Sequence, residues 1–427
     1  MTKGCMILDE AFKNPEKYDV IIAGGGPSGL FCAATASKEK KKVLVLEKKN
    51  TCGKKLLITG LSQCNLTQDG DIKSFFTHYG DNGKFLKSSL LNFTNKDLVS
   101  FFNERGLETV VEKGNKVFPV TKKALDVLEI LLLECKKNGA LIICDEKIIS
   151  ASQKSGVFAV KTDCSEYICE NLVIATGGIT YPATGSTGDG YKIAKSFGHT
   201  VAETGPALCS VNISDYEFSD LPGISFENAK ISLYHGNKKI RESFGDILFT
   251  HTGLSGPGIL HMSRYIKPGD MLKISFLPMF SPDSFIKDFS EKISADGKKT
   301  VRSVIQSYGL YERFAKKTLD ICEISYDITC AHLPKDKKSR LSKELCEHSF
   351  AVSALACLNE AMVTRGGVAL SEINPKTMES KVCPHLYFTG EVLDFDGDTG
   401  GYNLQAAFST GYAAARNIIL TGLKSTE

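Results

Sequence analysis

The residues with the clearest chemical meaning are three glycines near the start of the chain. Gly24, Gly26 and Gly29 have the spacing G-x-G-x-x-G, with Pro27 and Ser28 before the last glycine. Gly24 permits a tight turn, Gly26 lets the backbone approach a pyrophosphate that a Cβ would obstruct, and Gly29 lets a helix pack closely on a strand. A helix that begins here presents unpaired N–H groups and its positive dipole end to phosphates. The pattern therefore predicts a phosphate-binding turn.

An acidic residue follows at the distance expected for ribose recognition. Glu47 lies 18 residues after Gly29 and is followed by Lys48. Its carboxylate can accept hydrogen bonds from the hydroxyls of an adenosine ribose, and it would repel a 2′-phosphate. A glycine-rich turn in an unrelated α/β protein would leave Glu47 unexplained. The turn and the acid together predict dinucleotide binding.

The elements that must position these residues are visible around them. Residues 20–22 form a β-branched run typical of a buried parallel strand, residues 30–37 form a helical stretch of small residues, and residues 43–46 form a second apolar strand. Together they make a βαβ unit of about 30 residues. This unit predicts an α/β fold with a Rossmann-like parallel sheet.

The other end of the chain carries a matching junction. Residues 386–389 predict a short strand that stops at Gly390 and Glu391, and Gly400 and Gly401 precede a helix of small residues that runs to about residue 418. A second helix N-terminus would then face the same ligand, where it can stabilise negative charge on a reduced ring. Between the two ends, residues 171–178 read NLVIATGG, a buried strand whose small final residues let a flat ligand lie close.

The early G-x-G-x-x-G with Glu47, the strand ending in ATGG and the late LYFTGE resemble the FAD domain of glutathione-reductase-type flavoproteins. Further segments follow in order: GKKLLITG, CNLT, VFPVT, ATGGITYPATGSTGDGY, LFTHTGLSGPGIL, VTRGGV, EINPKTMESK and GEVLDFDGDTGGYNLQ. These blocks resemble the BaiN/YhiN-type flavoproteins, the aminoacetone-oxidase-like NAD(P)/FAD-dependent oxidoreductases.

The resemblance implies an extended FAD, with the late Gly–acid junction near the ribityl chain and the pyrophosphate. The residues it implies around the cofactor are Gly24, Gly26, Pro27, Ser28, Gly29, Glu47, Lys48, Lys55, Thr176, Gly177, Gly390, Glu391, Gly400, Gly401, Tyr402 and Asn403. One segment departs from the family pattern. Leu61 and Ser62 replace a glycine pair and Gln63 replaces an arginine, so the substrate or the activity can differ from those of relatives.

Three residues are candidates for catalysis, each with a plain structural alternative. Cys64 can protonate a substrate carbon after hydride transfer, or it is a small packed residue. His251 can donate to a substrate carbonyl, or it bonds a loop carbonyl. Arg365 can place positive charge near the flavin ring, or it forms a surface salt bridge. The eight histidines show no ligand spacing with Cys or acids, so no metal site is predicted.

Composition limits the class of protein. The 427 residues carry 52 Lys and Arg against 49 Asp and Glu, a net charge of +3, which is too mild to imply nucleic-acid binding and does not exclude it. No apolar run approaches the roughly 18 residues of a membrane span. The polar N-terminus and 14 scattered cysteines predict a cytoplasmic protein with reduced thiols. The sequence does not indicate an oligomeric state.

The order of the segments predicts a split FAD-binding domain. We expect it at residues 1–200 and 350–427, interrupted by a β-rich subdomain at 201–280, with a hairpin turn at Gly236 and Asn237, and by a small lysine-rich helical subdomain at 281–349.

Three functions fit these features. The first is an FAD-dependent oxidoreductase, linked to transiently bound NAD(P)H, that acts on a small substrate with an activated C=C or C=O bond or an amine. The second, also implied by the resemblance, is reduction of a uridine in ribosomal RNA to dihydrouridine. The third is a non-catalytic flavoprotein or redox sensor.

Overall fold

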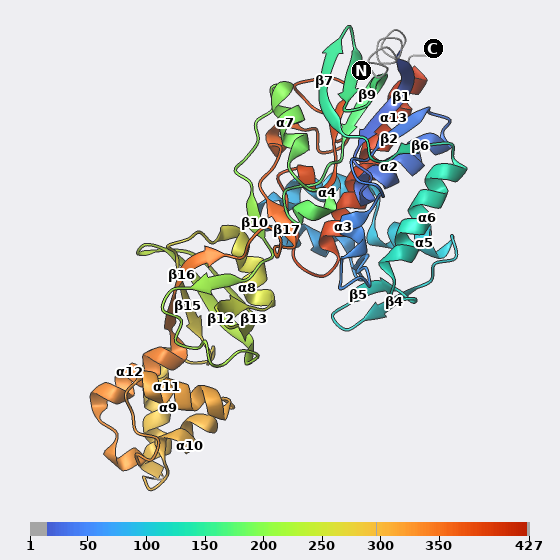
Figure 1. The fold of residues 1–427 in the computed structure, drawn as a ribbon. Helices are drawn as coiled ribbons and strands as arrows, with labels where there is room; N and C mark the ends of the chain where they lie inside the picture. The colour runs from blue at the N-terminus through green and yellow to red at the C-terminus, as the bar shows by residue number, and fades with distance from the viewer. Residues whose placement is uncertain (1–14, 296, 425–427) are drawn as a thin grey trace, which may run out of the picture. The chain divides into compact units, whose positions relative to one another are not determined.

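The chain is divided by its internal contacts into two units. The computed structural model describes residues 15–295 and 297–424. Unit 1 comprises the residues up to Gly205 and those from Met362 onward, and unit 2 is Pro206–Ala361 (Figure 1). We expected the chain to return to the first domain at residue 350. Instead, β16 (His348–Leu355) still pairs with two strands of unit 2, so the return lies at Met362.

The centre of unit 1 is a parallel sheet. Its strands are β1 (Glu16–Ala23), β2 (Val43–Leu46), β6 (Leu141–Ile143), β9 (Glu166–Ile174) and β18 (Leu386–Phe388). They lie in the order β6-β2-β1-β9-β18, and every neighbouring pair is parallel. In order along the chain this is 3-2-1-4-5, the arrangement of a Rossmann-like sheet. The predicted fold class is therefore confirmed.

An antiparallel hairpin extends this sheet. β7 (Ile148–Lys154) pairs with β8 (Val157–Thr162), and β8 pairs with the first half of β9, leaving the second half of β9 for β18. The central parts of β1 and β2 are apolar and buried, as expected for strands in the interior of a parallel sheet.

Helix α2 (Pro27–Lys38) packs against α6 (Ala124–Lys137) and α13 (Tyr402–Lys424), so helices from the early and late parts of the sequence lie side by side (Figure 1). Small residues allow the close approach of α2 and α13. A Cβ at Gly411 would lie 2.4 Å from the carbonyl oxygen of Ser28. Helix α13 begins at Tyr402, so the helix predicted to follow Gly401 is present.

Shorter elements complete unit 1. They are α3 (Lys54–Leu57), α4 (Gly83–Asn92), α5 (Asn95–Asn103), α7 (Asp189–Ser196), the strand β17 (Val363–Arg365), and a small antiparallel sheet of β3 (Thr67–Gln68), β5 (Lys116–Pro119) and β4 (Thr109–Glu112). The strand β10 (Gly205–Ala207) spans the boundary between the units.

Unit 2 is built on a closed six-stranded barrel. Its strands in spatial order are β11 (Val211–Ile213), β14 (Gly253–Ser255), β13 (Lys238–Phe249), β12 (Ser225–His235), β15 (Met271–Ser275) and β16. The expected hairpin turn at Gly236 and Asn237 is confirmed, because His235 pairs with Lys238. Closure leaves no exposed sheet edge.

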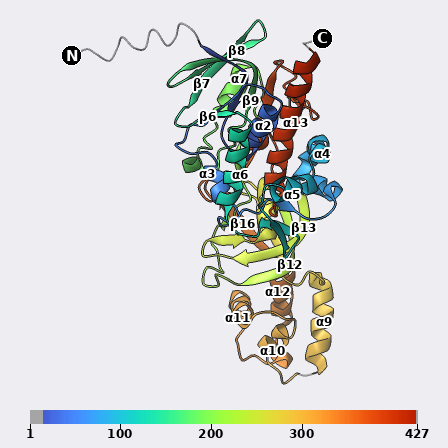
Figure 2. The ribbon, with the colours of Figure 1, turned by 90° about the vertical axis from the view of Figure 1, so that its right-hand side faces the viewer.

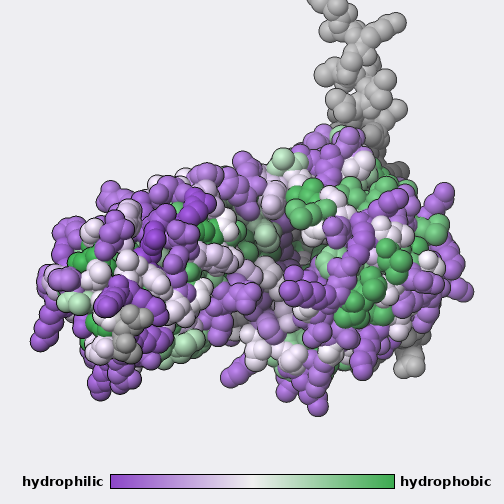
Figure 3. All heavy atoms as spheres, turned by 90° about the horizontal axis from the view of Figure 1, so that it is seen from below, coloured by the Kyte–Doolittle hydropathy of each residue, from purple (hydrophilic) through white to green (hydrophobic). Residues whose placement is uncertain are grey.

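Helices are added to the barrel at two places. The helix α8 (Pro257–Met262) follows β14. Between β15 and β16 the chain forms α9 (Pro282–Ala295), α10 (Val301–Gln306), α11 (Glu312–Ile321) and α12 (Lys335–Cys346), which gather at one end of the barrel (Figure 2). The face of the molecule drawn in Figure 3 is mainly hydrophilic, with smaller apolar areas. Among the described residues, no helix combines the length and apolarity needed to cross a bilayer.

Candidate nucleotide-binding site

A large open pocket in unit 1 lies at the carboxyl ends of the parallel strands. The empty space in it, including the part open to solvent, is about 1300 Å³. Ala23, Leu46 and Ala175 line it from the ends of β1, β2 and β9, and Thr389 lines it just after β18. In open α/β sheets, ligands bind at this edge, where the strand order reverses. The reversal in unit 1 falls between β1 and β9, at the centre of the pocket.

The three glycines of the early turn have the geometry that their predicted roles require. Gly24 has a φ of 109°, and a Cβ there would lie 2.5 Å from the carbonyl oxygen of Ala175. A Cβ at Gly29 would lie 2.1 Å from the carbonyl oxygen of Gly24, so glycine lets α2 pack on the turn. A Cβ at Gly26 would meet no atom within 4 Å, and Gly26 itself lines the pocket. Its bare backbone therefore faces space that a ligand can fill.

The N-terminus of α2 points its unused donors at this pocket. Gly26 is the N-cap and provides no side-chain cap, Pro27 begins the helix, and the first turn has no acidic residue. The first N–H groups of the helix therefore keep their positive potential for an anion. The start of α13 contributes Asn403 and Leu404 to the same pocket. Two helix N-termini thus converge there.

Glu47 is held rigidly at the end of β2. Its Oε2 accepts a hydrogen bond of 2.8 Å from the N–H of Gly25, and its Oε1 accepts one of 2.9 Å from the N–H of Lys49. Each carboxylate oxygen retains a further lone pair, since a carboxylate accepts about four hydrogen bonds. The pocket-lining Glu47 can therefore also bind a pair of ligand hydroxyls.

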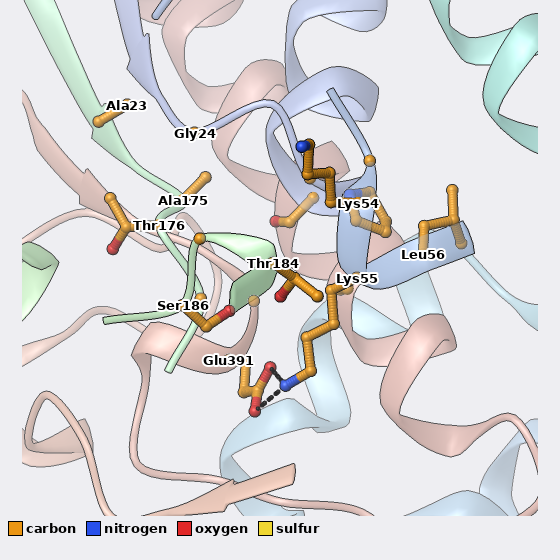
Figure 4. Close-up of a pocket in the computed structure, with 18 of the residues that line it drawn as sticks. Ala23, Gly24, Lys54, Lys55, Leu56, Ala175, Thr176, Thr184, Ser186 and Glu391 are labelled. Atoms are coloured by element: carbon orange, nitrogen blue, oxygen red, sulfur yellow. Dashed lines mark hydrogen bonds and ion pairs between the residues drawn. The ribbon is translucent and has the colours of Figure 1, made fainter. Parts of the chain in front are cut away.

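In the same pocket, Lys55 from α3 points directly at Glu391 (Figure 4). The Lys55 Nζ donates to Glu391 Oε1 at 2.9 Å, to Oε2 at 2.8 Å, and to Thr180 Oγ1 at 2.7 Å. Glu391 Oε1 also accepts from the N–H of Thr364 at 2.8 Å. Both side chains of the ion pair are only about one-fifth exposed, at 21% and 22%. The pair therefore forms an ordered, charged part of the pocket wall.

A second charged cluster lies at the end of the pocket near Glu47. Asp189, the first residue of α7, accepts from Lys48 Nζ at 2.6 Å and pairs with Lys147 Nζ at 3.1 Å. Burial would raise its pKa, but hydrogen bonds from Lys48, Thr187 and Lys147 lower the pKa of Asp189 to about 2. The loop before α7 is therefore fastened across this end of the pocket by ionised groups.

Several polar atoms in the pocket wall have no partner within the described part of the chain. The buried hydroxyls of Ser28, Thr176 and Thr389 make no hydrogen bond, and all three residues line the pocket. Buried polar groups in native proteins are normally paired, so these hydroxyls indicate a polar ligand. The bare Gly26, the helix N-termini and the orphaned hydroxyls fit the phosphates and hydroxyls of a dinucleotide.

Most of the predicted cofactor residues come together here. The pocket is lined by Gly24, Gly26, Pro27, Ser28, Glu47, Lys48, Lys55, Thr176, Gly177, Gly390, Glu391 and Asn403. Gly29, Gly400, Gly401 and Tyr402 do not line it. A Cβ at Gly401 would lie 2.5 Å from the backbone of Thr67, and Tyr402 is buried and stacked on His78 at a centroid distance of 4.1 Å. These residues set the start of α13.

The candidate catalytic residues lie outside this pocket lining. Cys64 is fully buried, and burial raises its pKa to about 12 against the opposing effect of a hydrogen bond with Thr59. Its surroundings favour the packed residue over the proton donor. His251 is an exposed residue of unit 2, between β13 and β14, and no hydrogen bond to a loop carbonyl holds it among the described residues.

The pocket also contains residues that the sequence analysis did not identify. They are Lys54, Leu56, Thr59, Glu146, Lys147, Ile148, Asp189, Met362, Val363, Phe395 and others from the same segments. The sequence did contain a signal for two of these residues, Glu146 and Lys147. The apolar residues 141–143 form β6, and the ends of parallel strands line such sites, so Glu146 and Lys147 could have been found from that strand.

The order of the parallel strands and the pocket at their carboxyl ends define unit 1 as a Rossmann-like dinucleotide-binding domain. A family model described as "HI0933-like protein Rossmann domain" matches residues 18–417. The chain belongs to this HI0933-like family, and the resemblance indicated by its motifs is thereby confirmed.

Three curated relatives align with nearly the whole chain. A "Ribosomal RNA dihydrouridine synthase" of Escherichia coli (strain K12) is 30% identical, with 95% of this chain and 98% of the relative covered. A protein of the same name from Haemophilus influenzae is 32% identical, with coverage of 93% and 98%. A "3-dehydro-bile acid delta(4,6)-reductase" of Clostridium scindens is 29% identical, with coverage of 92% and 97%.

Proposed function

We propose that this protein is an FAD-dependent reductase that takes hydride from NAD(P)H and delivers it to an activated C=C bond of a small substrate. The observation that carries the proposal is the pocket lined by the bare turn at Gly26, by Glu47 and by the first residues of α2 and α13. Bound FAD would supply the two-electron chemistry, and the protein would position it.

The pocket residues divide between the two ends of such a cofactor. Glu47, already fixed by two backbone N–H groups, would accept from the adenosine ribose hydroxyls. The N-terminus of α2 and the backbone at Gly26 would hold the pyrophosphate. Glu391, fixed by Lys55, would accept from hydroxyls on the flavin side. No second G-x-G-x-x-G occurs after another strand in the sequence, which favours transient binding of NAD(P)H.

The relatives' names favour reduction over amine oxidation. Dihydrouridine differs from uridine by two hydrogens added across one C=C bond, and the other name specifies a reductase acting at positions 4 and 6. The chemistry common to both names is addition of two hydrogens across an activated C=C bond. We therefore favour C=C reduction over C=O reduction and over amine oxidation as the reaction of this protein.

A ribosomal RNA substrate is the second candidate, supported by the two relatives with that name. The charges of unit 2 argue for the small substrate instead. Unit 2 carries 20 Lys and Arg against 19 Asp and Glu, a net charge of +1. Lys337 and Arg340 of its helical part both pair with Glu323, and Lys316 pairs with Glu312. These ion pairs neutralise part of the positive charge that phosphates would have to contact.

The first test is the cofactor and its reduction. We expect the purified protein to be yellow, to release FAD on denaturation, and to lose its absorbance near 450 nm when NADH or NADPH is added without oxygen. A small conjugated enone or enoate should then restore the colour. A colourless protein that does not bind added FAD would overturn the proposal, and flavin that neither nicotinamide reduces would remove NAD(P)H from it.

The second test separates the two substrates. Ribosomal RNA from a strain lacking this gene should have an unchanged dihydrouridine content if the substrate is a small molecule. Loss of one dihydrouridine, restored by the wild-type gene, would replace the small substrate with RNA.

A further inference from the structure

Arg365 differs from the well-paired arginines of the protein. Arg105 bonds Glu134 at 2.8 Å and lies over the ring of Phe101, and Arg340 pairs with Glu323. Within the described residues, the half-buried Arg365 differs in forming no ion pair, and its buried Nε, like that of Arg105, has no hydrogen-bond acceptor. A guanidinium withdrawn from water without an anion is unfavourable. Arg365 therefore does not form, with any described residue, the surface salt bridge that was the alternative to a role near the flavin.

The side chain is nevertheless held in a defined place by glycine backbone. A Cβ at Gly205 would lie 3.0 Å from both Nε and Nη2 of Arg365, so the guanidinium lies against a residue with no side chain. The next two residues, Gly366 and Gly367, have φ values of 76° and 147°, and a Cβ at Gly366 would lie 2.1 Å from the carbonyl oxygen of Glu203. The surrounding backbone thus accommodates only glycine and leaves room for the arginine.

Arg365 also lies two residues from the pocket lining in the same strand. It is the third residue of β17, and Val363, the first, lines the pocket. Side chains two residues apart in a strand leave it from the same face, about 7 Å apart. Thr364 between them takes the other direction, where its Oγ1 accepts from the N–H of Ile179 at 2.8 Å. The side chain of Arg365 therefore leaves β17 on the same face as that of the pocket-lining Val363.

We propose that Arg365 is the binding residue for a carboxylate carried by the substrate. The inference rests on the proposed function, and it narrows the substrate class to unsaturated carboxylic acids. A guanidinium offers a planar fork of N–H donors that matches a carboxylate with two parallel hydrogen bonds. A single unpaired arginine suits one such group, whereas RNA binding draws on many phosphate contacts.

The test compares acids with their neutral esters. Crotonate, trans-cinnamate and a steroid-sized 3-oxo-4-ene carboxylate, each with its methyl ester, are titrated into the FAD-loaded protein and followed by calorimetry. For at least one pair we expect the wild-type protein to bind the acid at least tenfold more tightly than the ester. R365M should remove this preference by weakening the acid at least tenfold while leaving the ester unchanged, and R365K should give an intermediate value because it loses the fork.

R416M is the matched control, because Arg416 is an exposed arginine of unit 1 and its replacement removes the same charge. It should retain the preference for acids. Equal binding of acid and ester by the wild-type protein, unchanged acid binding in R365M, or no binding of any acid would each overturn the inference. So would a loss confined to binding of a uridine-containing oligonucleotide, which would assign Arg365 to RNA.

The same samples show whether a negative result contradicts only carboxylate binding by Arg365 or also the proposed function. Each is assayed for FAD content and for bleaching by NADH and NADPH. A yellow, reducible wild-type protein without a preference for acids contradicts only the role of Arg365. A protein without FAD contradicts the proposed function itself.

Discussion

Lys55 and Glu391 lie 336 residues apart in the sequence, yet the ammonium of Lys55 bonds both carboxylate oxygens of Glu391, at 2.9 and 2.8 Å. The pair joins α3, which follows the glycine turn, to the junction after β18. It therefore couples the segments from the two ends of the chain that form the pocket.

Replacing Lys55 should weaken FAD binding without affecting the adenosine end. In K55M, Glu391 would lose its counterion in a half-buried position, so its carboxylate would no longer be held in the orientation that Lys55 fixes. We expect a loss of roughly tenfold in FAD affinity, about 1.4 kcal/mol. The affinity for ADP should be unchanged, and K55R should restore most of the binding. Calorimetry on the apoprotein measures both ligands, and equal losses for FAD and ADP would contradict this division of the pocket.

Replacing Glu47 should give the opposite pattern. E47Q keeps the size of the side chain but removes the charge that accepts from the N–H of Gly25 and from ribose hydroxyls. We expect both FAD and ADP to bind at least tenfold more weakly, because both contain the adenosine ribose. Unchanged ADP binding in the same assay would mean that Glu47 does not face the ribose.

Two glycine substitutions should separate cofactor binding from folding. G26V directs a side chain into open pocket space, so the protein should fold with a melting temperature within a few degrees of wild type but contain no flavin. G29V drives a side chain into the carbonyl oxygen of Gly24, so it should reduce stability or soluble yield. The ratio of absorbance at 450 and 280 nm, together with thermal unfolding, measures both effects. Normal flavin content in G26V would be inconsistent with a pyrophosphate at this turn.

Asp189 should control how fast the cofactor leaves. D189N would weaken the ionic bonds to Lys48 and Lys147 that fasten the loop before α7. We expect FAD to dissociate several-fold faster, and the acceleration of wild-type release by salt to be smaller in the variant. Because the pKa of Asp189 is about 2, the difference between the two proteins should not change between pH 5 and pH 8. Stopped-flow measurement of flavin fluorescence provides the rates; identical rates would exclude a role for this cluster in retention.

His199 should make the protein less stable in mild acid. Burial lowers its pKa below the ordinary value of 6.5, against the opposing hydrogen bond and charge of Glu372. The unfolded chain therefore binds a proton at a higher pH than the folded chain, and the free energy of unfolding should fall as the pH drops below about 6.5. Urea unfolding at pH 7.5, 6.5 and 5.5 measures this slope. H199Q should reduce the slope between pH 6.5 and 5.5; a slope equal to that of wild type would assign it to other groups.

The local parts of the site could be predicted from sequence, and the distant parts could not. The role of Gly24 as a turn residue and the packing of Gly29 on Gly24 depend on neighbouring residues, and the structure has the corresponding φ of 109° at Gly24 and the close approach of Gly29 to the Gly24 carbonyl. Asp189 and Lys147 meet only because separate loops fold over the same edge of the sheet. The boundary at residue 350 was wrong because β16 belongs to the barrel through pairing with β11 and β15, which no local pattern reveals. The ion pair of Lys55 and Glu391 depends on the same kind of distant contact.

The split organisation of unit 1 fixes an order of events during biosynthesis. All strands of the barrel have been made once residue 361 has been added, whereas the pocket still lacks Gly390, Glu391 and Asn403. Domains tend to fold as units while the ribosome is still at work. The barrel can therefore mature on the nascent chain, but the lining of the pocket cannot be complete before Asn403 has been added. Cofactor loading is thus a late step in the life of each new molecule.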